Sequence, residues 1–369
     1  MYKALQKIKK QMSKSSLIFF VYNMVNPKFH RQYKGWSINN KITIIQRKYK
    51  QIKLDLPRNI AIEVISHCIL DCEFCMLQSL KTWEYRRKSQ MSFEEFKKII
   101  DDIAWFTTDI QFSGGEPIMN KDLFKMLDYC REKTINTLLA TNGILLSYKN
   151  NTNDLLEHPP NKIMLSYESP DKAVYELIRK KANSKDGDFE MLFNNIKNII
   201  DKKKESGKVL PVIMLQMVLT KKNVGQVKEF WKSVKDLGAD YGSVKALGIW
   251  PEGDEDYDKK MIDEYIIPYS ENPISRHEIN EDGKPIFFRK PGQCPATKHC
   301  YIGSGGEVLP CWYILAKTEV LGNALDDNFV NIWNSDNYLE YRYKMLNDWA
   351  NPLCHRCIGV GATSERRKI

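Results

Sequence analysis

Residues 62–77 read IEVISHCILDCEFCML, an apolar run followed by a segment that carries Cys68, Cys72 and Cys75. Three of the nine cysteines of the chain therefore fall within eight residues. Soft thiolates favour zinc, copper(I) or an iron–sulfur cluster. A structural zinc site is normally closed by a fourth ligand, whereas three thiolates leave one position open for a substrate or cofactor. His67 could be a fourth ligand, but its side chain would point away from Cys68 if the strand still holds there.

Outside this stretch, apolar runs of strand length alternate with segments of helical periodicity. The expected strands lie within residues 58–65, 108–117, 135–143, 161–168, 211–220 and 239–248, and the expected helices within 92–106, 121–133, 189–206 and 223–238. Such alternation predicts parallel strands with crossover helices, in an α/β barrel or a doubly wound sheet. No GxGxxG dinucleotide fingerprint follows a strand, which favours the barrel.

Two short motifs carry a family resemblance. Residues 68–75, CILDCEFC, have the pattern CxxxCxφC with Phe74 as the aromatic residue, and GGEP follows at residues 114–117. Together they resemble the signatures of the radical S-adenosylmethionine (radical SAM) superfamily. The resemblance implies a partial (β/α)6 TIM-like barrel. It also implies a [4Fe–4S] cluster held by Cys68, Cys72 and Cys75, whose fourth iron is chelated by the methionine part of S-adenosylmethionine.

The same resemblance assigns residues to the cofactor. The backbone of Gly114 and Gly115, together with Glu116, would hold the methionine amino group, an ammonium beside a carboxylate. Ser166 and Glu168, at the end of the fourth expected strand, would contact the ribose or the carboxylate.

Other positions match the family less closely. Arg179 corresponds to an arginine often found after the fourth strand, but Ser169 stands where many similar enzymes have glycine. The residues alone leave open a strand-end serine, a solvated glutamate and a surface arginine at these places. Cys130 falls in an expected helix and is interpreted as a small buried residue.

A second group of cysteines follows near the C-terminal end: Cys294, Cys300, Cys311, Cys354 and Cys357. The Gly-x4-Cys spacing from Gly306 and the CxxC pair resemble the auxiliary-cluster domain called SPASM, or its shorter relative called twitch. Five thiols are too few for two fully cysteine-ligated clusters, so one auxiliary [4Fe–4S] cluster is expected, with zinc as the alternative. Cys311, Cys354 and Cys357 are the expected ligands. Cys294, which has twitch-like spacing, or Cys300 would be the fourth, and a free Cys300 could donate hydrogen in catalysis.

Charge and composition divide the chain further. Residues 1–58 carry 14 lysines and arginines against one acid, so +13, while the rest carries 42 against 45, so −3. We expect a basic extension at 1–58, a radical SAM core at 59–250, a connector at 251–293 and an auxiliary domain at 294–369. Within the connector, a short hairpin is expected around Asp282 and Gly283. The first 25 residues of the extension, a basic segment with helical spacing followed by an apolar run, are interpreted as an accessory helix packed on the core, with an anionic membrane surface or an acidic partner or substrate as alternatives.

Several classes are excluded. No run of 18 apolar residues is present, which argues against a spanning helix. The short apolar run at residues 17–25 lacks a small-residue cleavage site, so a secretory signal is not expected, and cysteines used as ligands suit a reducing cytoplasm. The eight tryptophans show no spacing that suggests stacking on nucleic acid.

The resemblance finally implies a reaction. An electron from a reduced flavodoxin or ferredoxin would lead to a 5′-deoxyadenosyl radical, which abstracts hydrogen from the substrate. A fully ligated auxiliary cluster would then accept an electron, so we expect oxidation of a sugar, nucleotide-sugar or lipid-linked glycan. The alternatives are a redox-neutral epimerase that uses Cys300, a maturase of a ribosomal peptide, and a zinc-stabilised binding protein without activity.

Overall fold

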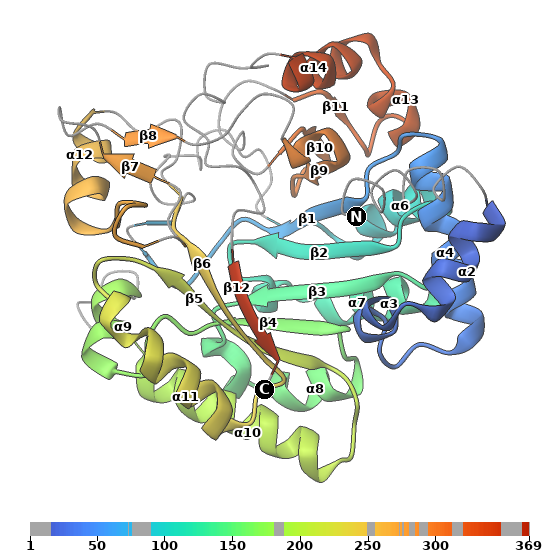
Figure 1. The fold of residues 1–369 in the computed structure, drawn as a ribbon. Helices are drawn as coiled ribbons and strands as arrows, with labels where there is room; N and C mark the ends of the chain where they lie inside the picture. Colours follow the sequence, from blue (N-terminus) through green and yellow to red (C-terminus); the bar gives the residue numbers. More distant parts are fainter. Residues whose placement is uncertain are drawn as a thin grey trace.

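Six parallel strands form the centre of one ten-stranded sheet in the computed structural model (Figure 1). The structure describes residues 16–72, 74–75, 90–180, 188–248, 255–272, 274, 277–279, 285–287, 294–311, 320–347 and 364–368. The strand order is β11-β10-β9-β1-β2-β3-β4-β5-β6-β12, and each of β1 to β5 pairs in parallel with the next strand. The central strands are β1 (Asn59–Ile65), β2 (Asp109–Gly114), β3 (Asn136–Thr141), β4 (Lys162–Ser166), β5 (Val212–Leu219) and β6 (Tyr241–Ala246). The predicted α/β partial barrel is confirmed, because six successive parallel strands form a sheet that does not close on itself.

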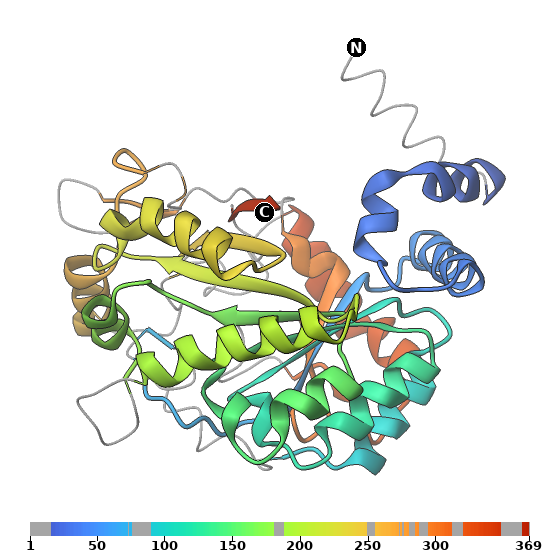
Figure 2. The same cartoon turned by 90° about the horizontal axis from the view of Figure 1, so that it is seen from below.

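Helices cover the outer face of these strands. In Figure 2 the green and yellow helices run alongside the sheet. The helices after β1 to β5 are α6 (Phe93–Ile103), α7 (Leu123–Glu132), α8 (Asn151–Glu157), α9 (Lys172–Ile178), α10 (Phe189–Glu205) and α11 (Val227–Leu237). Alternate strand residues such as Ile62, Phe112 and Leu139 face these helices and form the main apolar core. Cys130, on α7, is fully buried in that core, as predicted.

Helix α6 shows how the sequence sets these elements. Ser92 is its N-cap: the Ser92 hydroxyl accepts from the backbone N–H of Glu95, and the Glu95 carboxylate accepts from the backbone N–H of Ser92. Losing such a cap costs about 1 kcal/mol. Helical spacing then presents one buried face, made of Phe96, Ile99, Ile100 and Ile103.

The N-terminal extension packs on the barrel. It contains α2 (Ser16–Val25), α3 (Pro27–Gln32) and α4 (Ile38–Lys53), the blue helices at one side of Figure 2. The Tyr33 hydroxyl donates to Asp109 at the start of β2 (2.8 Å), and Arg47 donates to the carbonyls of Thr107 (3.2 Å) and Thr134 (3.0 Å). These contacts pack α4 and the residue after α3 on the core. The segment expected as an accessory helix, residues 2–25, is described only from Ser16, so that expectation stays a prediction. No helix among the described residues combines the length and apolar character needed to cross a membrane.

The remaining strands extend the sheet at both edges. Strands β9 (His299–Ile302), β10 (Glu307–Leu309) and β11 (Gly322–Asn323) continue it beyond β1, with β9 parallel to β1. Strand β12 (Ser364–Lys368) pairs antiparallel with β6. Helices α13 (Phe329–Trp333) and α14 (Asp336–Asn347) follow β11.

The segment expected as a connector contains α12 (Glu255–Glu264) and an antiparallel pair, β7 (His277–Ile279) with β8 (Pro285–Phe287). The pair agrees with the predicted hairpin, although its expected turn residues, Asp282 and Gly283, lie outside the described residues. The division of the chain into four ranges stays a prediction.

Candidate active site

The three-cysteine segment follows β1 at the carboxyl end of the central strands. Active sites of barrels are built from the loops at this end, because the loops after successive parallel strands converge there. Cys72 is buried, and Cys68 and Cys75 are partly exposed. The backbone N–H of Cys75 donates to the carbonyl of Cys72 (2.8 Å), which makes a tight turn between these two thiols.

The GGEP turn after β2 is held directly against this segment. The N–H of Gly115 donates to the carbonyl of Ile65, and the N–H of Glu116 donates to the carbonyl of His67, both at 2.7 Å. A Cβ atom on Gly115 would lie 1.9 Å from the His67 oxygen, and one on Gly114, whose φ is +120°, would lie 2.0 Å from the Ile65 oxygen. The two glycines are therefore needed so that the turn can approach the cysteine segment.

Glu116 links this turn to the end of β3. Its side chain is fully buried, and its carboxylate accepts hydrogen bonds from the Thr141 hydroxyl (2.7 Å) and from the backbone N–H groups of Asn142 (2.7 Å) and Ile118 (3.2 Å). Burial raises the pKa of the Glu116 carboxyl, while these hydrogen bonds lower it. Because a carboxylate has about four acceptor positions, at most one remains for the predicted contact with a cofactor amino group.

Arg179 lies over the cysteine segment rather than on the surface. Its guanidinium forms a buried ion pair with Glu168, with Nε 3.1 Å from the Glu168 carboxylate. It also donates to the sulfur of Cys72 (3.7 Å) and lies 5.3 Å from the ring centroid of Phe74. The other Glu168 oxygen accepts from the N–H of Val218 on β5 (2.6 Å). Glu168 therefore orients Arg179, and Arg179 brings a fixed positive charge to the Cys72 thiol.

The two serines near the end of β4 differ in their surroundings. Ser166 is the last residue of β4, is partly exposed, and pairs in register with Gln216 of β5. Ser169 is fully buried, and its hydroxyl accepts from the N–H of Asp171 (3.0 Å) in the turn before α9. Ser166 thus remains the residue of the two that is open to a ligand.

Asn142 is a site residue that the sequence reading missed. Its side-chain amide donates to the sulfur of Cys68 (3.7 Å), while its backbone N–H donates to Glu116. It therefore connects the two family motifs. One sequence signal could have found it: Asn142 and Gly143 form the turn directly after the third expected strand. In the structure Gly143 has a φ of +78°.

The donor set fits an iron–sulfur cluster. Burial raises the pKa of Cys68 to about 12, with nearby Glu116 adding to the effect, and raises the pKa of Cys72 to about 11 against the opposing effect of Arg179. Without a bound cation these thiols would stay protonated. Among the described residues no three His, Cys, Asp or Glu side chains converge to hold a single ion. A [4Fe–4S] cluster does not require this, since each thiolate binds a different iron.

The second cysteine group is described only in part. Cys294, which precedes the 3-10 turn Pro295–Lys298, Cys300 on β9 and Cys311 after β10 are all buried. The expected ligands Cys354 and Cys357 lie outside the described residues. Which thiols bind the auxiliary cluster therefore stays a prediction.

Cys300 faces the main apolar core. It pairs in register with Ile60 of β1 and belongs to the same core as Trp333 and Tyr338. Burial raises the pKa of the Cys300 thiol above its usual range. Tyr301, the next residue on the strand, points to the opposite face. The expectation that Cys300 reaches a substrate pocket finds no support in this position.

Glu63 is a further residue that sequence reasoning missed. It lies on β1, two residues before the strand ends, and is only 2% exposed. Its carboxylate accepts from the hydroxyls of Tyr301 (2.7 Å) and Ser304 (3.1 Å). A Cβ atom on Gly114 would lie 2.9 Å from Glu63 Cγ, so this cluster borders the GGEP turn.

Comparisons with known proteins agree with this geometry. The family model of the radical SAM superfamily matches residues 62–233, and that of the iron–sulfur cluster-binding SPASM domain matches residues 294–358. The AdoMet-dependent heme synthase of Oleidesulfovibrio alaskensis is 24% identical over 83% of this chain and 84% of its own. The mycofactocin maturase MftC of Mycolicibacterium smegmatis is 22% identical over 78% and 73%. The subtilosin biosynthesis protein AlbA of Bacillus subtilis is 25% identical over 76% and 60%.

Solved structures share the fold. Streptococcus suis SuiB superposes with a TM-score of 0.59 at 18% identity, over 89% of this chain and 83% of that one. SuiB has also been solved bound to S-adenosylmethionine and to its precursor peptide SuiA. The protein anSMEcpe with bound AdoMet superposes with a TM-score of 0.57 at 19% identity, over 79% and 84%.

Proposed function

Because the chain belongs to the radical SAM superfamily and carries a SPASM iron–sulfur domain, we propose that it oxidises its substrate after hydrogen abstraction. It is a radical SAM enzyme that uses S-adenosylmethionine and a [4Fe–4S] cluster. When bound, these groups supply a 5′-deoxyadenosyl radical, which takes a hydrogen atom from the substrate. In the proposed oxidation the substrate would then lose one proton and one electron, which a bound auxiliary cluster would accept, so the product would have two hydrogens fewer.

The residues of the chain have distinct tasks in this proposal. Cys68, Cys72 and Cys75 hold the cofactor cluster, and Arg179 donates to Cys72 from a position that Glu168 fixes. The turn at Gly114 and Gly115 presents backbone groups beside the cysteine segment, where the methionine end of the cofactor would bind. Ser166, at the end of β4, would contact the ribose or the carboxylate.

The observation that carries the oxidative proposal is the pairing of β9 with β1. Asn59–Ile62 of β1 pair in parallel with His299–Ile302, and β1 leads directly into the cysteine segment. The two iron–sulfur regions therefore share one continuous sheet. This shared sheet supports the proposal because it fixes the auxiliary domain against the core. Cys294 and Cys311 lie at the amino end of β1, and the cysteine segment follows its carboxyl end, so an electron would travel along this strand.

The redox-neutral alternative requires a hydrogen donor on the substrate side. Cys300 was the thiol considered for this task, but it is 1% exposed and belongs to the apolar core. An S–H group enclosed by apolar side chains cannot approach a substrate radical without rearrangement of the core. This burial supports oxidation over epimerisation.

For the substrate we favour a peptide. Relatives include proteins named for maturation of mycofactocin and biosynthesis of subtilosin, and SuiB binds a precursor peptide. These names support a peptide over the sugar or glycan expected from the sequence. The heme synthase relative, which aligns over most of both chains, makes a heme precursor the second candidate.

Mass spectrometry of the product tests the proposal. The reconstituted enzyme would be incubated anaerobically with reductant, S-adenosylmethionine and small peptides encoded beside its gene, in D2O and in H2O. We expect a peptide lighter by two hydrogens, no deuterium at a non-exchangeable carbon, and one 5′-deoxyadenosine per product. A product of unchanged formula that carries one solvent deuterium would instead establish epimerisation.

A further inference from the structure

Strand β1 is irregular where it meets the GGEP turn. Its register against β2 is regular up to Glu63 and shifts before Ile65, which pairs with Gly114. Val64 is therefore an extra residue in β1, a β-bulge. Bulges bend a strand locally and are frequent beside active sites, where they change the direction of the chain. Beyond this bulge the Ile65 carbonyl accepts from the N–H of Gly115 (2.7 Å), so the bulge sets where the GGEP turn docks.

One anchor of the bulge is a buried asparagine. The side-chain amide of Asn120 donates to the carbonyls of Val64 (2.7 Å) and Met91 (2.9 Å). Asn120 lies three residues after the GGEP turn, so the chain that leaves the turn holds the bulged residue in place. This anchor belongs entirely to the barrel.

The other anchor is the side chain of Glu63, which the auxiliary hairpin holds. Ile62 and Val64, its neighbours on β1, belong to the main apolar core, so Glu63 points to the opposite, inner face of the sheet. There its carboxylate accepts from Tyr301 on β9 and from Ser304 in the turn between β9 and β10. Hydrogen bonds to an ionised acceptor are among the strong ones, so these two hydroxyls fix where the buried carboxylate lies.

The stem of the Glu63 side chain in turn supports Gly114. A Cβ atom added to Gly114 would lie 2.9 Å from Glu63 Cγ, so this carbon packs directly against the Gly114 backbone. The next two residues, Gly115 and Glu116, donate their N–H groups to the β1 strand end and the cysteine segment. A displacement of the Glu63 side chain would therefore move the start of the GGEP turn, where the resemblance to the family places the methionine end of the cofactor.

We propose that Glu63 is a positioning residue through which the β9–β10 hairpin sets the GGEP turn for binding of S-adenosylmethionine. The hairpin holds the Glu63 carboxylate, and the Glu63 stem holds Gly114. The affinity for the cofactor thus depends on a hairpin that belongs to the segment matching the SPASM domain. Because coupling between two sites is reciprocal, bound S-adenosylmethionine also stabilises the hairpin. This role concerns cofactor binding, so its failure would leave the proposed oxidation untouched.

The test measures the dissociation constant of S-adenosylmethionine for the reconstituted full-length enzyme, with its clusters oxidised so that the cofactor is not cleaved. Tyr301→Phe and Ser304→Ala each remove one donor to Glu63. Tyr33→Phe is the matched control, because the buried Tyr33 hydroxyl also donates to a carboxylate, that of Asp109 (2.8 Å), but at the amino end of β2. Iron analysis and circular dichroism verify that all variants carry the same clusters and are folded.

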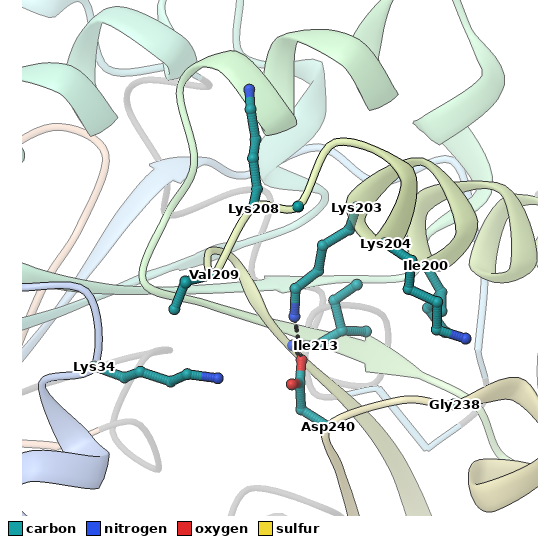
Figure 3. A pocket seen from close by; sticks show the side chains of 10 residues that line it. Lys34, Ile200, Lys203, Lys204, Lys208, Val209, Ile213, Gly238 and Asp240 are labelled. Atoms are coloured by element: carbon teal, nitrogen blue, oxygen red, sulfur yellow. Dashed lines mark hydrogen bonds and ion pairs between the residues drawn. The ribbon is translucent and has the colours of Figure 1, made fainter.

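The acid itself has a control at the same far end of the barrel. Asp240 accepts from Lys203 and from the N–H of Ile213 (2.8 Å), beside a pocket of about 390 Å³ at the amino ends of β5 and β6; the dashed line in Figure 3 marks its pair with Lys203. Glu63→Ala and Asp240→Ala each delete a hydrogen-bonded carboxylate, but only Glu63 lies beside the GGEP turn. Glu63→Gln is the conservative variant, because its amide keeps an acceptor and the hydroxyls can also accept from its NH2 group.

We expect Tyr301→Phe and Ser304→Ala to bind the cofactor at least about threefold more weakly than the wild type, and Glu63→Ala at least about tenfold more weakly, since one hydrogen bond is worth a several-fold change in an equilibrium constant. Glu63→Gln should recover most of the affinity, and Tyr33→Phe and Asp240→Ala should bind like the wild type. A purely structural bond would lower stability without changing the affinity of the folded protein. The proposal is therefore overturned if Tyr301→Phe and Ser304→Ala bind as tightly as the wild type, if Tyr33→Phe weakens binding equally, or if Glu63→Gln binds as weakly as Glu63→Ala.

Discussion

The hydroxyl of Tyr301 donates to the buried carboxylate of Glu63 across 2.7 Å, although 238 residues separate the two in the chain. Glu63 lies in the segment that matches the radical SAM family, and Tyr301 lies in the segment that matches the SPASM domain. The hydroxyl of Ser304 donates to the same carboxylate. One buried acid thus joins the strand that leads to the cofactor cysteines with the first hairpin of the auxiliary domain.

Replacing Tyr301 by Phe should destabilise the protein. The substitution leaves the Glu63 carboxylate with one donor fewer in a buried setting, which costs about 1–3 kcal/mol. Urea denaturation followed by circular dichroism measures the loss. Tyr148→Phe is the matched control, because Tyr148 is 57% exposed. Equal stability of the two variants would contradict a structural role for the Tyr301–Glu63 bond.

Cys72→Ala should abolish cleavage of S-adenosylmethionine and leave the auxiliary cluster in place, since the two sites use separate thiols. Iron analysis should give about eight irons per reconstituted wild-type chain and about four in the variant. Cys130→Ala is the control, because Cys130 is buried on α7 among apolar side chains. Unchanged cofactor cleavage in Cys72→Ala would refute the assignment of this site.

Arg179→Met should be strongly destabilising. It leaves Glu168, which is fully buried, without its ion-pair partner. Breaking a buried pair from one side costs about 3–5 kcal/mol. The double variant Glu168→Gln/Arg179→Met should recover part of this loss, because the neutral amide can still accept from Val218. Denaturation curves of both single variants and the double variant measure the coupling, and strictly additive effects would argue against it.

Stability should fall at alkaline pH through Tyr33. Burial, and then the Asp109 carboxylate, raise the pKa of the Tyr33 hydroxyl well above 10. A raised pKa means that the folded state keeps its proton longer than the unfolded state. The contribution is therefore complete below pH 10 and is lost as pH rises from there through the folded-state pKa. Tyr33→Phe should be less stable at neutral pH but show a flatter decline above pH 10, whereas Tyr148→Phe should follow the wild type.

Cys300→Ala should make normal product and retain the wild-type iron content. This follows from the oxidative proposal together with Cys294 as the fourth auxiliary ligand. Product analysis in D2O and iron analysis measure both quantities. Loss of about four irons in Cys300→Ala, with Cys294→Ala unaffected, would show that Cys300 is the ligand instead. Loss of solvent deuterium from the product with full iron content would favour the epimerase.

Much of the fold, and the two motifs of the candidate site, could be predicted from short stretches of the sequence. The strands β1 to β6, the cap at Ser92 and the buried face of α6 follow from periodicities of two and 3.6 residues and from the turn residues between them. The cysteine segment and the GGEP turn are contiguous motifs whose spacing reflects their chemistry. Backbone geometry within a few residues is enough to specify such features.

Other site relationships needed the tertiary structure. Arg179 could be read equally as a surface residue, and its contact with Cys72 spans 107 residues. Glu63 carried no sequence signal, because a charged residue in a strand does not reveal its partner. That Cys300 faces the apolar core depended on the register of β9 against β1. A shift of one residue would turn Tyr301 to the core and Cys300 to the opposite face of the strand.

The sequence by itself therefore determined the superfamily and the parallel strand–helix order, and it predicted the thiols of the cofactor cluster, because these depend on short spacings and local periodicity. The tertiary structure alone decided which side of β9 faces the core and which acid joins β1 to the strand that carries Tyr301. Those outcomes arise from strand register and from the packing of segments distant in the chain, which no local pattern encodes.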